Sequence, residues 1–513
     1  MNGAQALIRT LVGAGVDVCF ANPGTSEMQF VAALDTVPSM RAILALFEGV
    51  ATGAADGYAR VAGRPAATLL HLGPGLGNGL ANLHNARRAH SPVVNLVGDH
   101  ATYHKKYDAP LESDIEAVAA SLGWVRRSDS PAEVGADAAR TVAAAQEPPG
   151  GVATLILPAD VAWGDGGRAA SPVPARVPRQ VPETAVKSVA AILRTGEPTA
   201  LLIGGAACQE RGLRAVNRIA TATGLKPFME TFPARIQRGA GLPAVERLAY
   251  HAEHVAYQLE GTTHVIVAGT KPPVSFFAYP GRASDLVPAG AQVHILAELG
   301  GDVVAALESL ADEVAPGTLP VLQQARRSPL PRGPLTPRNW VEVIGALLPD
   351  GAIVSDESVT SGLLLPAATA GAPRHDVLPL TGGAIGQGLP VAVGAAVAAP
   401  DRPVIALQAD GSAIYTISAL WTMARENLDV TTILLNNRSY AILRTELQRV
   451  GAGRSGPKAD ELLDLSRPDL DFTKIAEGMG VPATRARTAE ELAGQFSRAV
   501  AEPGPHLIEV ILE

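Results

Sequence analysis

Cysteine is scarce in this chain, since only Cys19 and Cys208 occur among 513 residues. Two cysteines cannot build a disulfide framework, which excludes the small disulfide-stapled folds. Each cysteine lies among apolar residues, so we expect two buried thiols. The chain also lacks the Cys/His spacing of a structural zinc site and the Gly-x-Ser-x-Gly turn of a serine hydrolase.

Excess positive charge and long hydrophobic runs are also missing. The formal net charge is −8 and the isoelectric point is near 5.8, which argues against nucleic acid or an anionic membrane as the main partner. The longest apolar run, residues 389–399, contains Pro390 and Gly394 and is too short to span a bilayer. The N-terminus has no long apolar core typical of a signal peptide. We therefore expect a cytoplasmic protein with no membrane or nucleic-acid partner.

What the chain does contain is a repeated alternation of helical and strand patterns, with 47% hydrophobic residues to bury. The alternation predicts an α/β fold built from doubly wound parallel sheets. A chain of this length needs more than one core. Two stretches rich in proline, near 163–183 and 319–338, are typical of linkers. We expect three domains, over residues 1–163, 184–318 and 338–513.

The most informative stretch is Val404–Glu446, which reads as a strand, a helix and a second strand. Asp410 follows the first strand, and Asn436 and Asn437 follow the second. A crossover of this kind makes the strands parallel and brings their carboxyl ends to one edge of the sheet. A carboxylate and an amide oxygen at one edge suit a hard cation such as Mg²⁺, and the start of a helix attracts phosphate.

The spacing of these residues carries the main resemblance. Asp-Gly-Ser at Asp410 and Asn-Asn ending at Asn437 are similar to the cofactor motif of thiamine-diphosphate-dependent enzymes. The likeness extends over essentially the whole chain and is closest to the acetolactate synthase large subunits and benzoylformate decarboxylases. It implies that Asp410, Asn437 and the carbonyl of Ser439 hold Mg²⁺, which bridges the cofactor diphosphate. Ala409 stands where the family motif usually has glycine.

Glu48 is the second anchor of the resemblance. We expect it to end an apolar strand over residues 42–47, and burial there would favour sharing a proton. From the residues alone, a helix-starting glutamate that complements the helix dipole is the favoured interpretation. The segment FEGVATGAADGYAR is similar to the family segment whose glutamate contacts the cofactor aminopyrimidine. In that family the glutamate comes from the neighbouring subunit, which implies a homodimer or a dimer of dimers.

Other positions match the family one at a time. His71, and Thr25 in ANPGTSE, are similar to substrate-facing positions of benzoylformate decarboxylase, whereas acetolactate synthases usually lack the histidine. A lone strand-end histidine is more often structural. The segment from Thr381 to Gly386 resembles the one that supports the cofactor pyrimidine, through the carbonyl of Gly383 and the side chain of Ile385. Expected contacts to the diphosphate are Thr360, Gly411, Ser412 and Tyr415.

These resemblances imply a thiamine-diphosphate- and Mg²⁺-dependent enzyme that decarboxylates a 2-oxo acid, with or without ligation to a second carbonyl, as in an acetolactate synthase. The alternatives are a benzoylformate decarboxylase-like enzyme and a catalytically silent relative that binds cofactor and partners. FAD, which acetolactate synthases carry, is not favoured because no Arg-rich dinucleotide pattern is found. A nicotinamide site is not favoured either, since Gly73 and Gly75 are followed by Asn78 where the fingerprint needs glycine.

Overall fold

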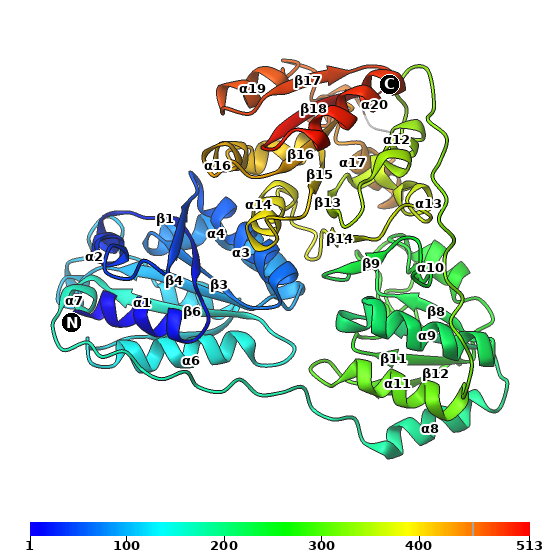
Figure 1. Ribbon diagram of the computed structural model, residues 1–513, viewed down its shortest axis with the longest axis horizontal. Coiled ribbons are helices and arrows are strands. Elements are labelled where there is room, and N and C mark those ends of the chain that lie inside the picture. Colours follow the sequence, from blue (N-terminus) through cyan, green and yellow to red (C-terminus); the bar gives the residue numbers. More distant parts are fainter. Residues whose placement is uncertain (454–455, 513) are drawn as a thin grey trace.

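The computed structural model describes residues 1–453 and 456–512, so residues 454–455 and 513 of the expected third domain lie outside the described part. Three sheets follow one another along the chain, and helices cover them (Figure 1). The chain therefore has the expected α/β class with parallel sheets. No helix in the described residues is long and apolar enough to cross a membrane.

The N-terminal sheet has six strands in the order β2-β1-β3-β4-β6-β5, and every neighbouring pair is parallel. Helices α1, α2 and α6 pack on one face, while α3, α4 and α5 pack on the other. The strands are β1 (Val18–Asn22), β2 (Arg41–Leu44), β3 (Ala66–Leu70), β4 (Val93–Asp99), β5 (Gly123–Arg127) and β6 (Val152–Pro158). The helices are α1 (Gly3–Gly13), η1 (Thr25–Glu27), α2 (Met28–Leu34), α3 (Glu48–Ala62), α4 (Leu72–Arg88), η2 (Lys105–Tyr107), α5 (Ile115–Ala120), α6 (Val134–Gln146) and α7 (Ala159–Trp163).

The middle sheet has five parallel strands in the order β10-β8-β7-β11-β12. Its strands are β7 (Thr199–Ile203), β8 (Lys226–Met229), β10 (Glu246–Arg247), β11 (His264–Ala268) and β12 (Gln292–Ala297). Its helices are α8 (Glu183–Leu193), η3 (Gly205–Cys208), α9 (Glu210–Thr223), α10 (Ala252–Gln258) and α11 (Val303–Val314). Cys208 in this part and Cys19 in the first are both buried free thiols, as expected.

The C-terminal sheet has seven strands in the order β17-β18-β16-β15-β13-β14-β9. Its parallel strands are β13 (Ile353–Glu357), β14 (His375–Pro379), β15 (Val404–Ala409), β16 (Val430–Asn436), β17 (Ala483–Ala486) and β18 (His506–Ile511). Its helices are α12 (Asn339–Leu347), η4 (Val359–Gly362), α13 (Leu365–Ala368), α14 (Gly388–Ala398), α15 (Asp410–Ala413), η5 (Ile414–Thr416), α16 (Ala419–Arg425), α17 (Ala441–Arg449), α18 (Pro457–Leu462), α19 (Phe472–Gly478) and α20 (Ala489–Ala501).

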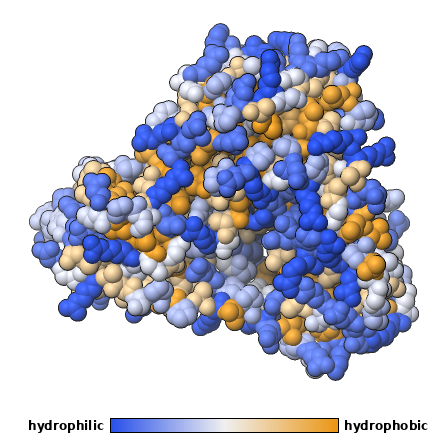
Figure 2. Space-filling model, viewed as in Figure 1, coloured by the Kyte–Doolittle hydropathy of each residue, from blue (hydrophilic) through white to orange (hydrophobic). Residues whose placement is uncertain are grey.

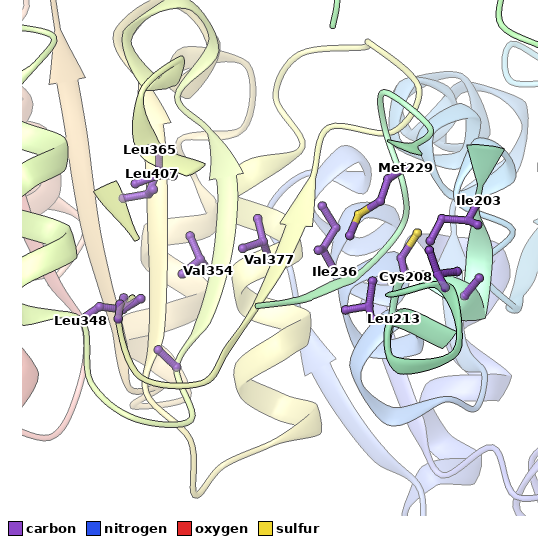
Figure 3. Close-up of a cluster of buried hydrophobic side chains, with 14 of the residues drawn as sticks. Ile203, Cys208, Leu213, Met229, Ile236, Leu348, Val354, Leu365, Val377 and Leu407 are labelled. Atoms are coloured by element: carbon purple, nitrogen blue, oxygen red, sulfur yellow. The ribbon is translucent and has the colours of Figure 1, made fainter. Parts of the chain in front are cut away.

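The edge strand β9 (Ile236–Arg238) is an exception to the parallel pattern. It comes from the middle part of the sequence and pairs antiparallel with β14. Ile236 is buried, and Arg235 beside it forms an ion pair with Asp376 of β14 at 3.0 Å. Figure 3 shows the apolar contacts that accompany this pairing, with Ile236 next to Val377 and with side chains from both parts of the chain. The middle and C-terminal parts therefore share a core.

The N-terminal and C-terminal parts meet where helices α3 and α14 cross (Figure 1). Glycines allow the close approach: a methyl group added to Gly57 would lie 2.2 Å from the carbonyl oxygen of Val391. A buried ion pair lies beside the crossing, with Arg60 Nη2 and Asp56 Oδ2 2.5 Å apart. Arg60 also donates to the Pro379 carbonyl at 2.8 Å. This junction holds the two end sheets in a fixed relation.

Two local expectations were wrong. Glu48 is the first residue of helix α3 and does not end a strand, because β2 already stops at Leu44. The helix expected after Asp410 is broken into α15, η5 and α16. The strand–helix–strand unit around it has the expected order, and β15 pairs parallel with β16.

Candidate active site

Asp410 lies at the carboxyl end of β15 and is almost completely buried, with 4% of the residue exposed. Its Oδ1 accepts a hydrogen bond from the N–H of Gly411 at 2.8 Å. Its Oδ2 accepts from the N–H groups of Asn437 at 3.1 Å and Arg438 at 2.7 Å. Burial raises the pKa of the Asp410 carboxyl, and these three N–H groups act against that rise. The carboxylate thus ties the ends of β15 and β16 together.

The two adjacent asparagines have different surroundings. Asn436 is buried, and its side-chain amide donates to Glu509 Oε1 at 2.8 Å inside the sheet. Asn437 is only partly buried, and its Oδ1 accepts the N–H of Ser439 at 3.0 Å. Asn437 and Ser439 therefore belong to the same tight turn beside Asp410. The structure brings together the three residues expected to hold the metal.

The donor set fits a hard cation. A carboxylate and an amide oxygen lie on adjoining turns, and both are ligands that Mg²⁺ prefers. Asp410 forms no ion pair with any lysine, arginine or histidine in the part of the chain that the structure describes. That part also holds no cluster of three Cys, His, Asp or Glu residues suited to a metal. Asp410, Asn437 and Ser439 would supply one carboxylate, one amide and one carbonyl oxygen, which do not form such a cluster. This finding is therefore compatible with a Mg²⁺ site at these residues.

Gly411 and Ser412 form the first turn after Asp410. A methyl group added to Gly411 would lie 2.5 Å from Cε1 of Tyr440, so glycine allows that ring to pack on the turn. Ser412 is buried and receives a hydrogen bond from Gln408 Nε2 at 2.6 Å. Helix α15 has only four residues. The turn is therefore positioned by side chains around it and not by a long helix.

The segment from Thr381 to Gly386 runs beside this turn. Gly383 has φ of +77° and Gly386 has φ of +92°, a region that favours glycine. A methyl group added to Gly386 would meet Tyr415 Cβ at 2.6 Å, which places the expected diphosphate contact Tyr415 against this segment. Ile385 is partly buried here, and Thr360 is partly buried on η4 after β13. The C-terminal site residues thus gather at one edge of the sheet.

Glu357 holds this arrangement together, and the sequence analysis missed it. The carboxylate is buried at the end of β13 and accepts the N–H groups of Gly386 and Gly388, each at 2.7 Å. Gln408 donates to it at 3.0 Å and also bonds Ser412. Burial raises the pKa of Glu357. One carboxylate therefore links the glycine segment to the turn that follows Asp410.

The N-terminal site residues gather at the carboxyl edge of the first sheet. Glu48 is 7% exposed, and Asn78 Nδ2 donates to its Oε2 at 3.0 Å. Gly75 lies between Glu48 and His71: a methyl group on it would be 3.1 Å from Glu48 Oε1 and 3.4 Å from His71 Cβ. The two expected acid–base residues are therefore neighbours across the start of α4.

His71 has an acidic partner that was not predicted. Its Nδ1 lies 2.8 Å from Oε2 of the buried Glu27, and Ser26 Oγ is 3.3 Å away. Such a partner fixes the orientation of an imidazole ring. Thr25 begins the same short turn η1, but neighbouring Ser26 makes the contact with the ring. The turn of Gly24–Glu27 thus packs against His71 and holds its ring in one orientation.

Asn82 joins the two groups of residues. Its Nδ2 donates to the carbonyl of Gly49, next to Glu48, at 2.8 Å and to the carbonyl of Gly386 at 3.2 Å. Among the described residues, no hydrogen bond or ion pair links Glu48 or His71 directly to Asp410 or Asn437. Within one chain the site therefore consists of two halves, connected through α4.

Buried carboxylates separate into two groups. In the described residues, nine acidic side chains are buried. Five of them have an arginine or lysine partner: Asp56, Asp99, Asp137, Asp376 and Glu509. The other four have none and are the site residues Glu27, Glu48, Glu357 and Asp410. Burying a charge without a partner is costly, so these four mark the region where another charge or a shared proton is needed.

Comparison with known proteins agrees with this geometry. Residues 1–120 match the N-terminal TPP binding domain of thiamine pyrophosphate enzymes, and residues 364–510 match the C-terminal TPP binding domain. The chain is 66% identical over 514 residues to the Mycobacterium tuberculosis protein named "Putative acetolactate synthase large subunit IlvX". The aligned region covers 100% of this chain and 99% of that protein. It is 32% identical over 533 residues to benzoylformate decarboxylase of Pseudomonas aeruginosa, covering 97% and 96%.

A solved structure agrees over the full length. The thiamine diphosphate-dependent 4-hydroxybenzoylformate decarboxylase of Rhodococcus jostii RHA1 superposes with a TM-score of 0.86 at 25% identity, covering 100% of this chain and 99% of that one. The chain therefore belongs to the thiamine pyrophosphate (thiamine diphosphate) enzyme family. Within it, the chain is similar to proteins named as acetolactate synthase large subunits and as benzoylformate decarboxylases.

Proposed function

We propose that the protein is a thiamine-diphosphate- and Mg²⁺-dependent enzyme that decarboxylates a 2-oxo acid, with or without ligation of the product to a second carbonyl compound. The observation that carries this proposal is the buried Asp410 carboxylate, which has no cationic partner among the described residues and lies beside Asn437 at the strand ends. Membership of the family supports the cofactor. The cytoplasm is the compartment we propose.

When bound, thiamine diphosphate supplies an electron sink for the negative charge left as a 2-oxo acid loses CO₂. Asp410, Asn437 and the Ser439 carbonyl would hold Mg²⁺ against the diphosphate, with Gly411, Ser412, Thr360 and Tyr415 around it. Gly383 and Ile385 would support the pyrimidine. Glu48 would exchange a proton with that ring, because a buried carboxylate whose one hydrogen-bond donor among the described residues is the Asn78 amide can hold or release a proton. His71, oriented by Glu27, would move a proton at the substrate.

We also propose that a second copy of the chain completes the site, in a dimer or a dimer of dimers. The support is a set of exposed large apolar side chains on the segments around the C-terminal half-site. On the face drawn in Figure 2, apolar side chains lie among hydrophilic ones over the upper, C-terminal part of the chain. Six such residues are 38% to 75% exposed: Val359, Leu363, Leu364, Ile414, Tyr415 and Leu443. Exposed large apolar side chains gathered on neighbouring segments are typical of an interface in soluble proteins. We propose that the chain is divided into three domains, over residues 1–163, 184–318 and 338–513.

The relative named as an acetolactate synthase large subunit favours carboligation. The His71–Glu27 pair favours a benzoylformate decarboxylase-like second candidate, because a positioned imidazole can protonate the product. FAD is not favoured in the middle domain: at the carboxyl ends of β8 and β11, the Thr270 hydroxyl donates to Glu230 Oε2 at 2.8 Å, and both side chains fill the space beside Gly204.

The test is CO₂ release from a panel of 2-oxo acids, with Mg²⁺ and thiamine diphosphate, for the wild type and Glu48→Gln. We expect the variant to lose roughly 10²- to 10⁴-fold in rate, the usual contribution of general acid–base catalysis. It should still bind thiamine diphosphate, measured by calorimetry. Glu477→Gln, a change at an exposed carboxylate of α19, serves as the control. Equal rates in wild type and Glu48→Gln would refute the role of Glu48, and no turnover in the wild type would favour a silent cofactor-binding relative.

A further inference from the structure

An aromatic cluster from the middle part of the chain lies against the segment expected to hold the pyrimidine. A methyl group added to Gly383 would be 2.6 Å from Cζ of Phe276, so this ring packs directly on the Gly383 backbone. Phe276 contacts Phe232, Tyr250 and Phe277, with ring centroids 5.8, 5.2 and 4.8 Å apart. We call these four residues the aromatic wall. Aromatic residues make up only 4% of the chain, so their concentration here needs a reason.

Two members of the aromatic wall remain open to solvent. Phe276 is 40% exposed and Phe277 is 53% exposed. Phe277 is supported from behind, since its ring packs edge-on against Phe276 at an interplanar angle of 72°. Its carbonyl accepts a hydrogen bond from Ser275 Oγ at 2.6 Å. An exposed phenylalanine held in place beside a cofactor segment is suited to contact an apolar group.

The segment that carries the aromatic wall also contacts the metal side of the site, through Tyr279. Tyr279, two residues after Phe277, donates to Glu446 Oε2 at 2.8 Å. Arg449 lies over the Tyr279 ring at 4.7 Å and pairs with Glu253 at 2.5 Å. Glu446 and Arg449 are on α17, which begins directly after the turn of Asn437 and Ser439. The cluster therefore spans from the pyrimidine segment to the helix that follows the metal turn.

We propose that Phe276 and Phe277 form the specificity-determining surface for the substrate side chain, and that the preferred substrates are 2-oxo acids with an apolar side chain larger than methyl. The proposal rests on the proposed function of the same site. Phe276 sets the position of the surface through Gly383, and Phe277 supplies its exposed face. Arg449, which is stacked on Tyr279, is already paired with Glu253, and so is Arg282 of the same loop as Tyr279. The surface thus recognises an apolar group and not a carboxylate.

The test compares kcat/KM for benzoylformate, 4-methyl-2-oxopentanoate and pyruvate in the holoenzyme. We expect the wild type to favour the two larger substrates. In Phe277→Ala their preference over pyruvate should fall about 10-fold, equal to about 1.4 kcal/mol, and Phe277→Leu should restore part of it. Tyr257→Ala, at another exposed aromatic residue of the middle part, should leave the preference unchanged.

The other outcomes are separable from the proposed function. If CO₂ is released but pyruvate is preferred, or if Phe277→Ala leaves the preference unchanged, the aromatic wall does not select the substrate while the decarboxylase remains. If Phe277→Ala lowers the rate equally for all substrates and changes the molar mass in light scattering, the surface is a subunit interface and the inference is overturned. If the wild type turns over no 2-oxo acid, the proposed function fails. Binding of benzoylformate to the holoprotein, seen by calorimetry, then decides the inference, and equal binding to Phe277→Ala overturns it.

Discussion

Replacing Asp410 by asparagine should change the stability of the cofactor-free protein only modestly, but it should remove most of the stabilisation that the cofactor provides. Asparagine has nearly the same shape and keeps one oxygen, which can still accept the N–H groups of Asn437 and Arg438. The bond from Gly411 N–H is lost. A hydrogen bond to a charged group contributes about 1.5–3 kcal/mol, and removing a buried negative charge offsets part of that loss. The cofactor-free variant should therefore be destabilised by no more than about 2 kcal/mol.

The cofactor response should change far more. A ligand present at 100 times its Kd stabilises the folded state by about 2.7 kcal/mol. Loss of the only carboxylate in the expected metal set should weaken binding at least about 100-fold, the upper range seen when even an outer-shell partner is removed. The same ligand concentration then equals Kd, and the stabilisation falls to about 0.4 kcal/mol. The difference, about 2 kcal/mol, is measurable.

The assay is thermal unfolding of wild type and Asp410→Asn, each with and without Mg²⁺ plus thiamine diphosphate, together with calorimetric titration of the cofactor. Asp429→Asn is the matched control. Asp429 is a partly buried aspartate that directly precedes β16, at the end of the strand away from the site, and burial raises its pKa as well. This control variant should keep the full cofactor response. If Asp410→Asn also keeps it, the site has been placed wrongly.

Three further predictions follow from single contacts. Glu357→Gln can accept only one of the N–H groups of Gly386 and Gly388, so we expect thiamine diphosphate affinity to fall roughly 10- to 100-fold in calorimetry; unchanged affinity would show that this carboxylate does not position the segment. Arg60→Met leaves a buried carboxylate without its partner and should cost about 3–5 kcal/mol of unfolding free energy in urea, whereas a cost below about 1 kcal/mol would contradict a buried pair. Burial lowers the pKa of His375 to about 4, so its stabilising contribution is present above pH 6.5 and is lost as the pH falls towards 4. The stability difference between wild type and His375→Gln should therefore shift by up to about 3 kcal/mol over that range, and a constant difference would refute the burial argument.

The sequence revealed the parts of the site that lie close together along the chain. Asp410 and Asn437 end neighbouring strands of one crossover unit, so their proximity follows from the strand–helix–strand pattern alone. The same pattern did not show that the helix after Asp410 is broken, because the apolar spacing of residues 417–428 is unaffected by a short irregular turn. Local periodicity thus predicts which strand ends meet, but it does not specify the backbone of the turns between them.

Other contacts depend on pairings across distant parts of the chain, and no local pattern encodes them. Glu27 and His71 are 44 positions apart, and Asn82 bonds Gly386 over 304 positions. Phe276 reaches Gly383 only because the middle and C-terminal sheets share a core. In the sequence, Glu27, Asn82 and Phe276 look like an ordinary glutamate, asparagine and phenylalanine. Their roles become visible only after the sheets have been placed.

The contrast between Asp56 and Asp410 shows what sequence reasoning needs in order to recognise a site. Both are buried aspartates whose following residue is a glycine, in segments rich in small residues. Asp56 has Arg60 one helical turn later, a spacing that a sequence reveals. Among the described residues, Asp410 has only backbone N–H groups as partners, and the lack of a cation within reach in that part of the chain becomes visible only in the folded protein. A buried carboxylate whose cation cannot be found along the chain is therefore a better guide to a cofactor site than the Asp-Gly pair itself, because burying an uncompensated charge costs stability that binding a cation can restore.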